Sequence, residues 1–324
     1  MENLLEVENL QIAFTKERKE VISVENVSFT LKPGETIGVV GESGCGKSVT
    51  SLSIMRLLGK SGQIKQGEIR FNGKDISKLS EDKLRSLRGN DISMIFQEPM
   101  TSLNPVLTIG DQLMEGIKLH LKLNKKEARV YAIDMLKKVR IPRAETIIDE
   151  YPHALSGGMR QRVMIAMALA CKPKLLIADE PTTALDVTIQ AQILELMRGL
   201  REESDTSIML ITHDLGVIAE MADKVIVMYA GQVVEEADVY TLFDNPKHPY
   251  TKGLMDSIPH IEYDGSDRLV SIPGSVPSIE HMPTGCRFHT RCPYVTERCL
   301  EEKPALEPVS ENHLVRCFLV ETGK

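Results

Sequence analysis

The stretch Gly41-Glu42-Ser43-Gly44-Cys45-Gly46-Lys47-Ser48 directly follows the short apolar run Thr36–Val40. It fits G-x-x-x-x-G-K-[ST], in which a strand leads into a glycine-rich loop that opens a helix. Glycines let backbone N–H groups turn inward around a polyphosphate, and the helix N-terminus adds partial positive charge. Lys47 is expected to reach the β- and γ-phosphates, and Ser48 to ligate Mg²⁺. The residues expected at the nucleotide are Gly41, Ser43, Gly44, Cys45, Gly46, Lys47, Ser48 and Val49.

A second apolar run, Leu175–Ala178, ends in two carboxylates, Asp179 and Glu180. Beside a phosphate loop, Asp179 is expected to hold Mg²⁺ through water, and Glu180 to orient or deprotonate the attacking water. A generic strand that ends before a capped helix has the same appearance, and it is the alternative for this segment.

Two polar residues also follow apolar runs. Gln97 comes after Ile92–Phe96 and is expected to sense Mg²⁺ or the γ-phosphate, with a polar strand-end residue as the alternative. His213 comes after Ile208–Thr212 and is expected to contact the γ-phosphate, with a structural histidine as the alternative. Both expectations depend on the order of these residues along the chain.

A third motif, Leu155-Ser156-Gly157-Gly158-Met159-Arg160-Gln161, precedes a helix predicted to begin near Met159. It is therefore a second candidate anion site at a helix terminus. One phosphate chain can be sandwiched between two such sites. A simple helix cap at Ser156 is the alternative.

Bulk properties indicate an ordinary soluble protein. The chain has 324 residues with 42% hydrophobic and 26% charged residues, which allows two domains or one domain with an appendage. A net charge of −7 gives no support for a nucleic-acid role. No apolar run approaches the roughly 20 residues that cross a bilayer, and the start Met1-Glu2-Asn3 lacks a secretion signal. We therefore expect a cytosolic location.

Strand runs alternate with helical patterns such as Val187–Arg201, which predicts an α/β fold with much parallel pairing. The segment Leu4–Leu31 predicts an antiparallel β layer, and the helix after Gly46 is expected to carry Leu52, Met55 and Leu58 on one face. Residues 98–158 form a predicted helical insert within a domain spanning 1–243. Nine of the 16 prolines lie from Pro246 onward, so residues 244–324 are expected to form a small, loop-rich appendage.

In their order, these motifs together with Ala184-Leu185-Asp186 resemble an ABC-type ATPase subunit, over residues 1 to about 240. The resemblance implies a P-loop NTPase fold, ATP hydrolysis and a head-to-tail dimer, in which Ser156 and Gly158 close over a γ-phosphate held by the partner subunit. It also implies that Gln161 belongs to the nucleotide site and that Phe14 stacks on adenine. A core aromatic is the alternative for Phe14.

The tail resembles that of dipeptide/oligopeptide permease ATPase subunits. The resemblance rests on Asn245–Thr251, Arg268-Leu269, Ile272-Pro273-Gly274 and a four-cysteine segment. It implies a second ATPase subunit (a paralogue), two transmembrane permease subunits, an extracytoplasmic solute-binding protein and a peripheral location on the cytoplasmic membrane face. Nickel-peptide importers share this tail, so the solute is not fixed.

Four cysteines, Cys286, Cys292, Cys299 and Cys317, are spaced C-x₅-C-x₆-C-x₁₇-C. Zinc sites usually have tighter pairs, whereas four thiolates suit a [4Fe–4S] cluster. Some members of the resembled family carry such a cluster at matching cysteines. We expect the cluster, with zinc or unmetallated thiols as the alternatives.

The sequence thus predicts the energy-coupling ATPase of a solute importer. A soluble ABC protein that acts in DNA repair or translation is the first alternative, although such proteins often carry two cassettes or long coiled-coil insertions, and neither is present here. A P-loop kinase is the second, and it leaves residues 155–161 unexplained.

Overall fold

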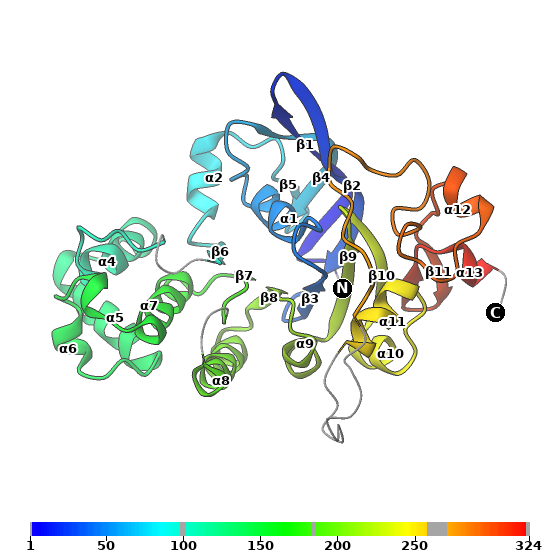
Figure 1. Ribbon diagram of the computed structural model, residues 1–324. Coiled ribbons are helices and arrows are strands. Elements are labelled where there is room, and N and C mark those ends of the chain that lie inside the picture. The colour runs from blue at the N-terminus through cyan, green and yellow to red at the C-terminus, as the bar shows by residue number, and fades with distance from the viewer. Residues whose placement is uncertain (1, 98–101, 183–185, 258–270, 322–324) are drawn as a thin grey trace. The chain divides into compact units, whose positions relative to one another are not determined.

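The computed structural model describes residues 2–97, 102–182, 186–257 and 271–321, and these form two compact units. The first unit comprises residues 1–32, 36–77 and 211–324, and the second comprises residues 33–35 and 78–210. Each unit is described by itself below (Figure 1).

An antiparallel layer in the first unit has the strand order β2-β1-β4-β5. Its two long strands are β1 (Leu5–Lys16) and β2 (Lys19–Leu31), and the shorter ones are β4 (Gly62–Phe71) and β5 (Lys74–Asp75). Leu5, Leu10 and Ile12 of β1 are fully buried, so this strand contributes to the core. The antiparallel layer predicted from Leu4–Leu31 is confirmed.

The same unit contains the strands β11 (Glu307–Ser310), β12 (His313–Val315), β10 (Gln232–Asp238), β9 (Lys224–Tyr229) and β3 (Thr36–Val40), which neighbour one another in that order. Strands β3 and β9 pair in parallel, and all five residues of β3 are buried. Strand β12 pairs antiparallel with β10. The C-terminal region, predicted to be loop-rich, therefore adds the short strands β11 and β12 to this sheet.

The helices of the first unit are short. They are α1 (Lys47–Ile54), α9 (Leu215–Met221), α10 (Val239–Asp244), α11 (Pro249–Asp256), α12 (Glu297–Glu301) and α13 (Phe318–Glu321). Helix α1 begins directly at the glycine-rich loop, as predicted. Its buried residues include Thr50, Ser51 and Ser53, whereas Leu52 is only half-buried and Leu58 lies beyond the helix. Met55, at the C-cap, is buried as predicted, but the rest of the predicted apolar face is wrong.

The second unit contains β8 (Ser207–Ile211), β7 (Leu175–Asp179) and β6 (Ile92–Ile95) in that order, with β6 parallel to β7. Its helices are α2 (Glu81–Leu87), α4 (Ile109–Leu121), α5 (Lys125–Lys138), α6 (Ala144–Ile147), α7 (Gly157–Leu169) and α8 (Val187–Ser204), and a 3₁₀ turn spans Pro152–Ala154. Figure 1 shows α4, α5, α6 and α7 gathered as one helical group.

Caps explain where these helices begin. The Asn124 side chain and Glu127 form a reciprocal capping box at α5, and the Thr108 hydroxyl accepts a bond from the Asp111 N–H at α4. The helical insert predicted for residues 98–158 stays a prediction; the described residues of that range include α4, α5 and α6, and residues 98–101 lie outside the described residues. Within the described part of the chain, no helix is both long enough and apolar enough to span a bilayer.

Candidate nucleotide site

The glycine-rich loop turns sharply between β3 and α1. Gly41 has φ 147°, and a Cβ there would lie 2.2 Å from the Met228 carbonyl oxygen, so only glycine fits. Gly46 has φ 102° and stands at the start of α1 without a side-chain cap. Ser43 and Gly44 are exposed, whereas Cys45 and Lys47 are buried. The loop therefore has the left-handed glycine conformations that its sequence pattern requires, and its tip at Ser43 and Gly44 is exposed.

Lys47, the first residue of α1, forms hydrogen bonds back to the glycine-rich loop. Its ammonium donates to the carbonyl oxygens of Gly41, at 2.6 Å, and Glu42, at 3.2 Å. Burial raises the pKa of the Cys45 thiol, despite the nearby Lys47 charge that lowers it. Cys45 is therefore a neutral, packed residue, and any contact with a nucleotide would be made by its backbone.

In the second unit, the structure brings Gln97 and Glu180 together. Gln97 follows β6, Glu180 follows β7, and these strands pair in parallel, so both side chains start from the same sheet edge. The Gln97 amide donates to Glu180 Oε2 at 3.1 Å. Asp179, the last residue of β7, is 3% exposed. The Gln97 amide and the Glu180 carboxylate thus lie together, with Asp179 next to Glu180 in the chain.

Gln161 lies against the turn that follows β7. Its side chain is buried, and its amide donates to the Pro181 carbonyl oxygen, one residue after Glu180. The side chain thus supports the turn that follows the carboxylates.

Ser156 caps α7 and is exposed. Its hydroxyl accepts from the Met159 N–H at 3.3 Å, and the helix begins at Gly157, two residues before the predicted start. A Cβ on Gly158 would lie 3.2 Å from Ile189 Cγ2, so a larger residue is disfavoured there. The N-terminus of a 13-residue helix therefore opens to solvent in the second unit.

His213 and Phe14 belong to the first unit. His213 is exposed between β8 and α9, where the Asp214 side chain caps the helix. Phe14 is half-buried near the end of β1, and a Cβ on Gly62 would lie 2.8 Å from its ring. One part of the ring packs on the strand layer, and the other part is accessible.

The four C-terminal cysteines lie near one another. The Cys286 N–H donates to the Cys299 carbonyl oxygen at 2.9 Å. Burial, with smaller effects from the thiols of Cys286, Cys292 and Cys299, raises the pKa of Cys317 to about 11. Among the described residues, however, no group of three or more His, Cys, Asp or Glu is placed to hold a metal ion. The structure therefore gives the predicted [4Fe–4S] cluster no direct support.

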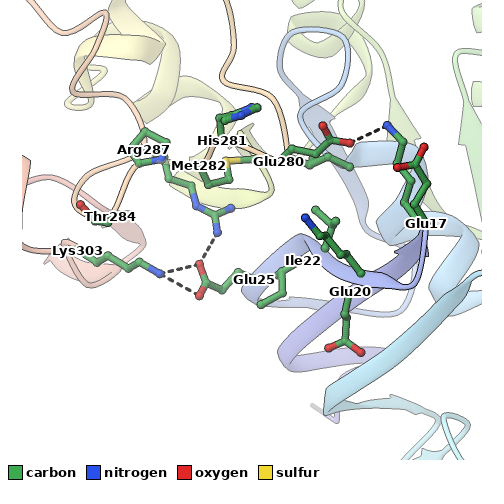
Figure 2. A pocket seen from close by; sticks show the side chains of 15 residues that line it. Glu17, Glu20, Ile22, Glu25, Glu280, His281, Met282, Thr284, Arg287 and Lys303 are labelled. Atoms are coloured by element: carbon green, nitrogen blue, oxygen red, sulfur yellow. Dashed lines mark hydrogen bonds and ion pairs between the residues drawn. The ribbon is translucent and has the colours of Figure 1, made fainter.

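A hollow of about 730 Å³ lies beside the β1–β2 hairpin (Figure 2). Its lining includes four basic residues (Lys16, Lys19, Arg287 and Lys303) and four acidic ones (Glu17, Glu20, Glu25 and Glu280). Arg287 and Lys303 pair with Glu25, and Lys16 pairs with Glu280. Because the charges balance, this hollow has no excess positive charge to attract a phosphate.

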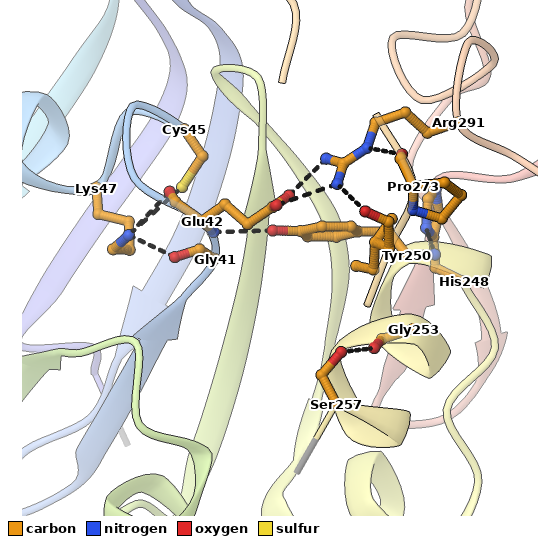
Figure 3. A network of polar contacts seen from close by, with 11 residues as sticks. Gly41, Glu42, Cys45, Lys47, His248, Tyr250, Gly253, Ser257, Pro273 and Arg291 are labelled. Carbon is orange, nitrogen blue, oxygen red and sulfur yellow. Dashed lines mark hydrogen bonds and ion pairs between the residues drawn. The ribbon is translucent and has the colours of Figure 1, made fainter. Parts of the chain in front are cut away.

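One contact at the loop was not predicted from the sequence. The Glu42 carboxylate is bonded by Arg291, 249 residues further along the chain (Figure 3). An acidic residue in the loop and a buried arginine in the tail were the available signals, and neither identifies the other without the fold.

Comparisons with known proteins agree with this geometry. Residues 24–183 match the family model described as "ABC transporter", and residues 234–299 match "Oligopeptide/dipeptide transporter, C-terminal region". The chain is 56% identical to the oligopeptide transport ATP-binding protein AppD of Bacillus subtilis (strain 168), covering 99% of this chain and 98% of AppD. It is 51% identical to the dipeptide transport ATP-binding protein DppD of Escherichia coli (strain K12), over 97% and 96% of the two chains.

Solved structures show the same fold. A dimeric post-hydrolysis state of the ATP-binding cassette MJ0796, bound to ADP and Pi, aligns with a TM-score of 0.66 at 28% identity, covering 72% of this chain and 98% of that one. The cassette cbiO1 of Clostridium perfringens aligns with a TM-score of 0.63 at 28% identity, over 76% and 92% of the two chains. The near full-length likeness to the ATP-binding proteins decides the matter: this chain belongs to the family of ABC transporter ATPases that carry the oligopeptide/dipeptide C-terminal region.

Proposed function

We propose that this chain is the ATP-hydrolysing subunit that energises an importer of di- or oligopeptides, or of a related solute such as nickel. The observation that carries the proposal is the likeness to AppD over 99% of the chain, which includes the C-terminal region as well as the cassette. The alternative of a soluble ABC ATPase in DNA repair or translation has no such relative among those described above.

The proposed chemistry assigns a role to each part of the site. Glu180 orients or deprotonates the attacking water, while Gln97 holds the Glu180 carboxylate and His213 contacts the γ-phosphate. The phosphates are bound by backbone N–H groups and side chains of Gly41, Ser43, Gly44, Cys45, Gly46, Lys47, Ser48 and Val49, and Phe14 stacks on adenine.

Mg²⁺ fits the available donors. Ser48, Gln97 and Asp179 would hold it with hydroxyl, amide and carboxylate oxygens, the hard ligands that this ion prefers. When bound, Mg²⁺ would neutralise charge on the phosphates.

The proposed assembly has two ATPase subunits. MJ0796 is dimeric, which supports a pair of cassettes for this chain. Ser156 and Gly158 of one chain would then face the nucleotide of the other, and Gln161 would support that site from within. We further propose that the second subunit is a paralogue, and that two transmembrane permease subunits and an extracytoplasmic solute-binding protein complete the importer on the cytoplasmic face of the membrane.

A [4Fe–4S] cluster on Cys286, Cys292, Cys299 and Cys317 stays a prediction that rests on the four cysteines in the C-terminal segment of the sequence. Protein purified without oxygen is expected to be brown and to contain about four irons per chain. A colourless, iron-free but folded protein would remove the cluster, and zinc analysis of the same sample tests the alternative.

Gentle detergent extraction of the tagged chain tests the main proposal. We expect two transmembrane subunits and a second ATPase to co-purify, and peptide-loaded binding protein to stimulate ATP hydrolysis by the reconstituted complex. Co-purification with ribosomes or DNA in place of membrane proteins would contradict it.

A further inference from the structure

The Glu42 carboxylate, inside the phosphate-binding loop, is held at two points by Arg291 (Figure 3). Arg291 Nη1 donates to Glu42 Oε2 at 2.6 Å, and Nη2 donates to Glu42 Oε1 at 3.1 Å. The Arg291 side chain is 2% exposed and that of Glu42 is 33% exposed. A two-point guanidinium–carboxylate pair fixes direction as well as distance.

The backbone of Glu42 is held as well. Its N–H donates to the Tyr250 hydroxyl oxygen at 2.8 Å, and its carbonyl oxygen accepts from the Lys47 ammonium at 3.2 Å. Burial raises the pKa of Tyr250 far above its usual range, so the hydroxyl remains a neutral acceptor. Tyr250, a residue of the C-terminal region, therefore holds the backbone of Glu42, the residue whose carbonyl oxygen Lys47 contacts.

Arg291 is itself anchored on the C-terminal side. Its Nε donates to the Pro273 carbonyl oxygen at 2.8 Å, its Nη2 donates to that of Ile272 at 3.1 Å, and its guanidinium lies 5.8 Å from the Tyr229 ring centre. Burial alone would lower the pKa of Arg291, but the Glu42 carboxylate raises it, so the arginine stays charged. The ion pair therefore has a fixed donor rather than a mobile surface side chain.

Aromatic packing makes this region a continuous body. The Tyr229 ring centre lies 4.6 Å from that of Tyr250 and 5.1 Å from that of Phe288. Tyr229 ends β9, the parallel neighbour of the strand β3 that leads into the loop. Phe288 and Arg291 both lie between Cys286 and Cys292, so the same segment supplies an aromatic contact to Tyr229 and the guanidinium that bonds to Glu42.

Charge gives the contact a second role. Glu42 lies in a loop that binds a strongly negative polyphosphate, and an uncompensated carboxylate there would oppose ATP binding. Arg291 cancels this charge at hydrogen-bonding distance. Since Glu42 is not among the residues expected to touch the nucleotide, its carboxylate can be committed to the C-terminal region.

We propose that Arg291 is a positioning residue for ATP binding: with Tyr250, it lets the C-terminal region fix Glu42 and cancel its charge. This inference rests on ATP binding by the chain, which the family shows, and not on the identity of the transported solute. A change in the C-terminal region that moves Arg291 would therefore change the position and the charge compensation of Glu42 in the phosphate-binding loop.

The test is equilibrium titration of the purified chain with a fluorescent ATP analogue, together with steady-state ATPase kinetics. Arg291→Gln is expected to raise the Kd and KM for ATP about 10-fold while kcat stays within about 2-fold, because the catalytic groups are untouched. Glu42→Gln and Tyr250→Phe are expected to have smaller effects. The double variant Glu42→Gln/Arg291→Gln is expected to bind no more weakly than Arg291→Gln alone, because one pair is lost in both.

Arg316→Gln is the matched control, since this arginine is equally buried in the C-terminal region but donates to the carbonyl oxygens of Val233 and Pro304. It is expected to lower stability without changing the Kd. The Arg291→Gln defect is also expected to shrink at about 0.5 M salt, because an exposed carboxylate is screened.

Native Kd in Arg291→Gln, or equal effects of the two arginine variants, would overturn the proposal. If Arg291→Gln does not fold, Tyr250→Phe and Glu42→Gln give the decision: native Kd in both overturns it. Failure of the native chain to bind ATP would instead count against the ATPase assignment.

Discussion

At the scale of single residues, Glu180 adopts a backbone conformation that is unfavourable for a residue with a side chain. Its φ is 48°, in the left-handed region, which is uncommon for a glutamate. The Gln97 amide holds the Glu180 carboxylate, and the buried Gln161 amide holds the next carbonyl along the chain. Strain maintained by neighbouring contacts is typical of functional sites, which supports a catalytic role for this carboxylate.

Replacing this carboxylate tests that role. Glu180→Gln is expected to lower kcat by about 100-fold or more, because removal of a general base typically costs 10²–10⁴ in rate. ATP affinity is expected to stay within about 3-fold, since the phosphate loop is unchanged, and the ATP-bound dimer should accumulate in size-exclusion chromatography. Glu203→Gln, an exposed residue paired with Lys138, is the control. Undiminished turnover in Glu180→Gln would exclude Glu180 as the water-activating group.

At the scale of elements, helix α11 depends on a histidine as its cap. His248 Nδ1 accepts the Tyr250 N–H at 3.0 Å, which requires an unprotonated nitrogen. Complete burial lowers the pKa of His248 to about 4, with Arg316 adding to this effect and Glu235 opposing it. The helix that supplies Tyr250 to the phosphate loop is therefore stable only while this imidazole is neutral.

The pH dependence of stability follows from this cap. The unfolded chain protonates His248 near 6.5 and the folded chain only near 4, so its stabilising effect is complete above 6.5 and is lost as the pH falls towards 4. Between pH 7 and 5 this single group is expected to remove about 2 kcal/mol from the free energy of unfolding. Urea unfolding at both pH values measures it. His248→Asn keeps a cap acceptor without titrating, and an equally steep pH dependence in this variant would assign the effect to another group.

Some strands and helices could be predicted from the sequence pattern, and others could not. The runs that became β3 and β7 were located almost to the residue, because buried parallel strands are continuous apolar runs. The start of helix α1 was predicted correctly, but most of its buried face was not. Its Thr50 and Ser53 hydroxyls donate to carbonyl oxygens within the helix, at 2.9 and 2.6 Å, so they are buried without unpaired groups. A pattern that counts them as polar cannot find this face.

At the scale of the whole molecule, features formed by neighbouring residues in the sequence were predicted, whereas contacts between residues far apart in the sequence were not. The phosphate loop and Asp179-Glu180 were found from local patterns, because each combines a strand end with a few fixed residue types. The strands β11 and β12 were missed since they have only four and three residues, and the contact of Arg291 with Glu42 joins residues 249 apart. Pairings of this kind depend on the complete fold, and no local pattern encodes them.

The pairing of two cassettes makes a prediction about Ser156 that a lone subunit would not. Ser156→Arg adds bulk and charge at the exposed N-terminus of α7, where the proposed pair places the partner's nucleotide. In the reconstituted complex, hydrolysis is expected to fall by about 50-fold or more, which is about 2 kcal/mol or more in activation free energy. ATP binding to the isolated chain is expected to stay within about 2-fold, because Lys47 and its loop are intact. Ser156→Ala is the control: it removes the cap, at a cost of about 1 kcal/mol in stability, but leaves the helix end open. Loss of ATP binding by the isolated Ser156→Arg chain would show that Ser156 serves its own nucleotide and that the interface is not shared.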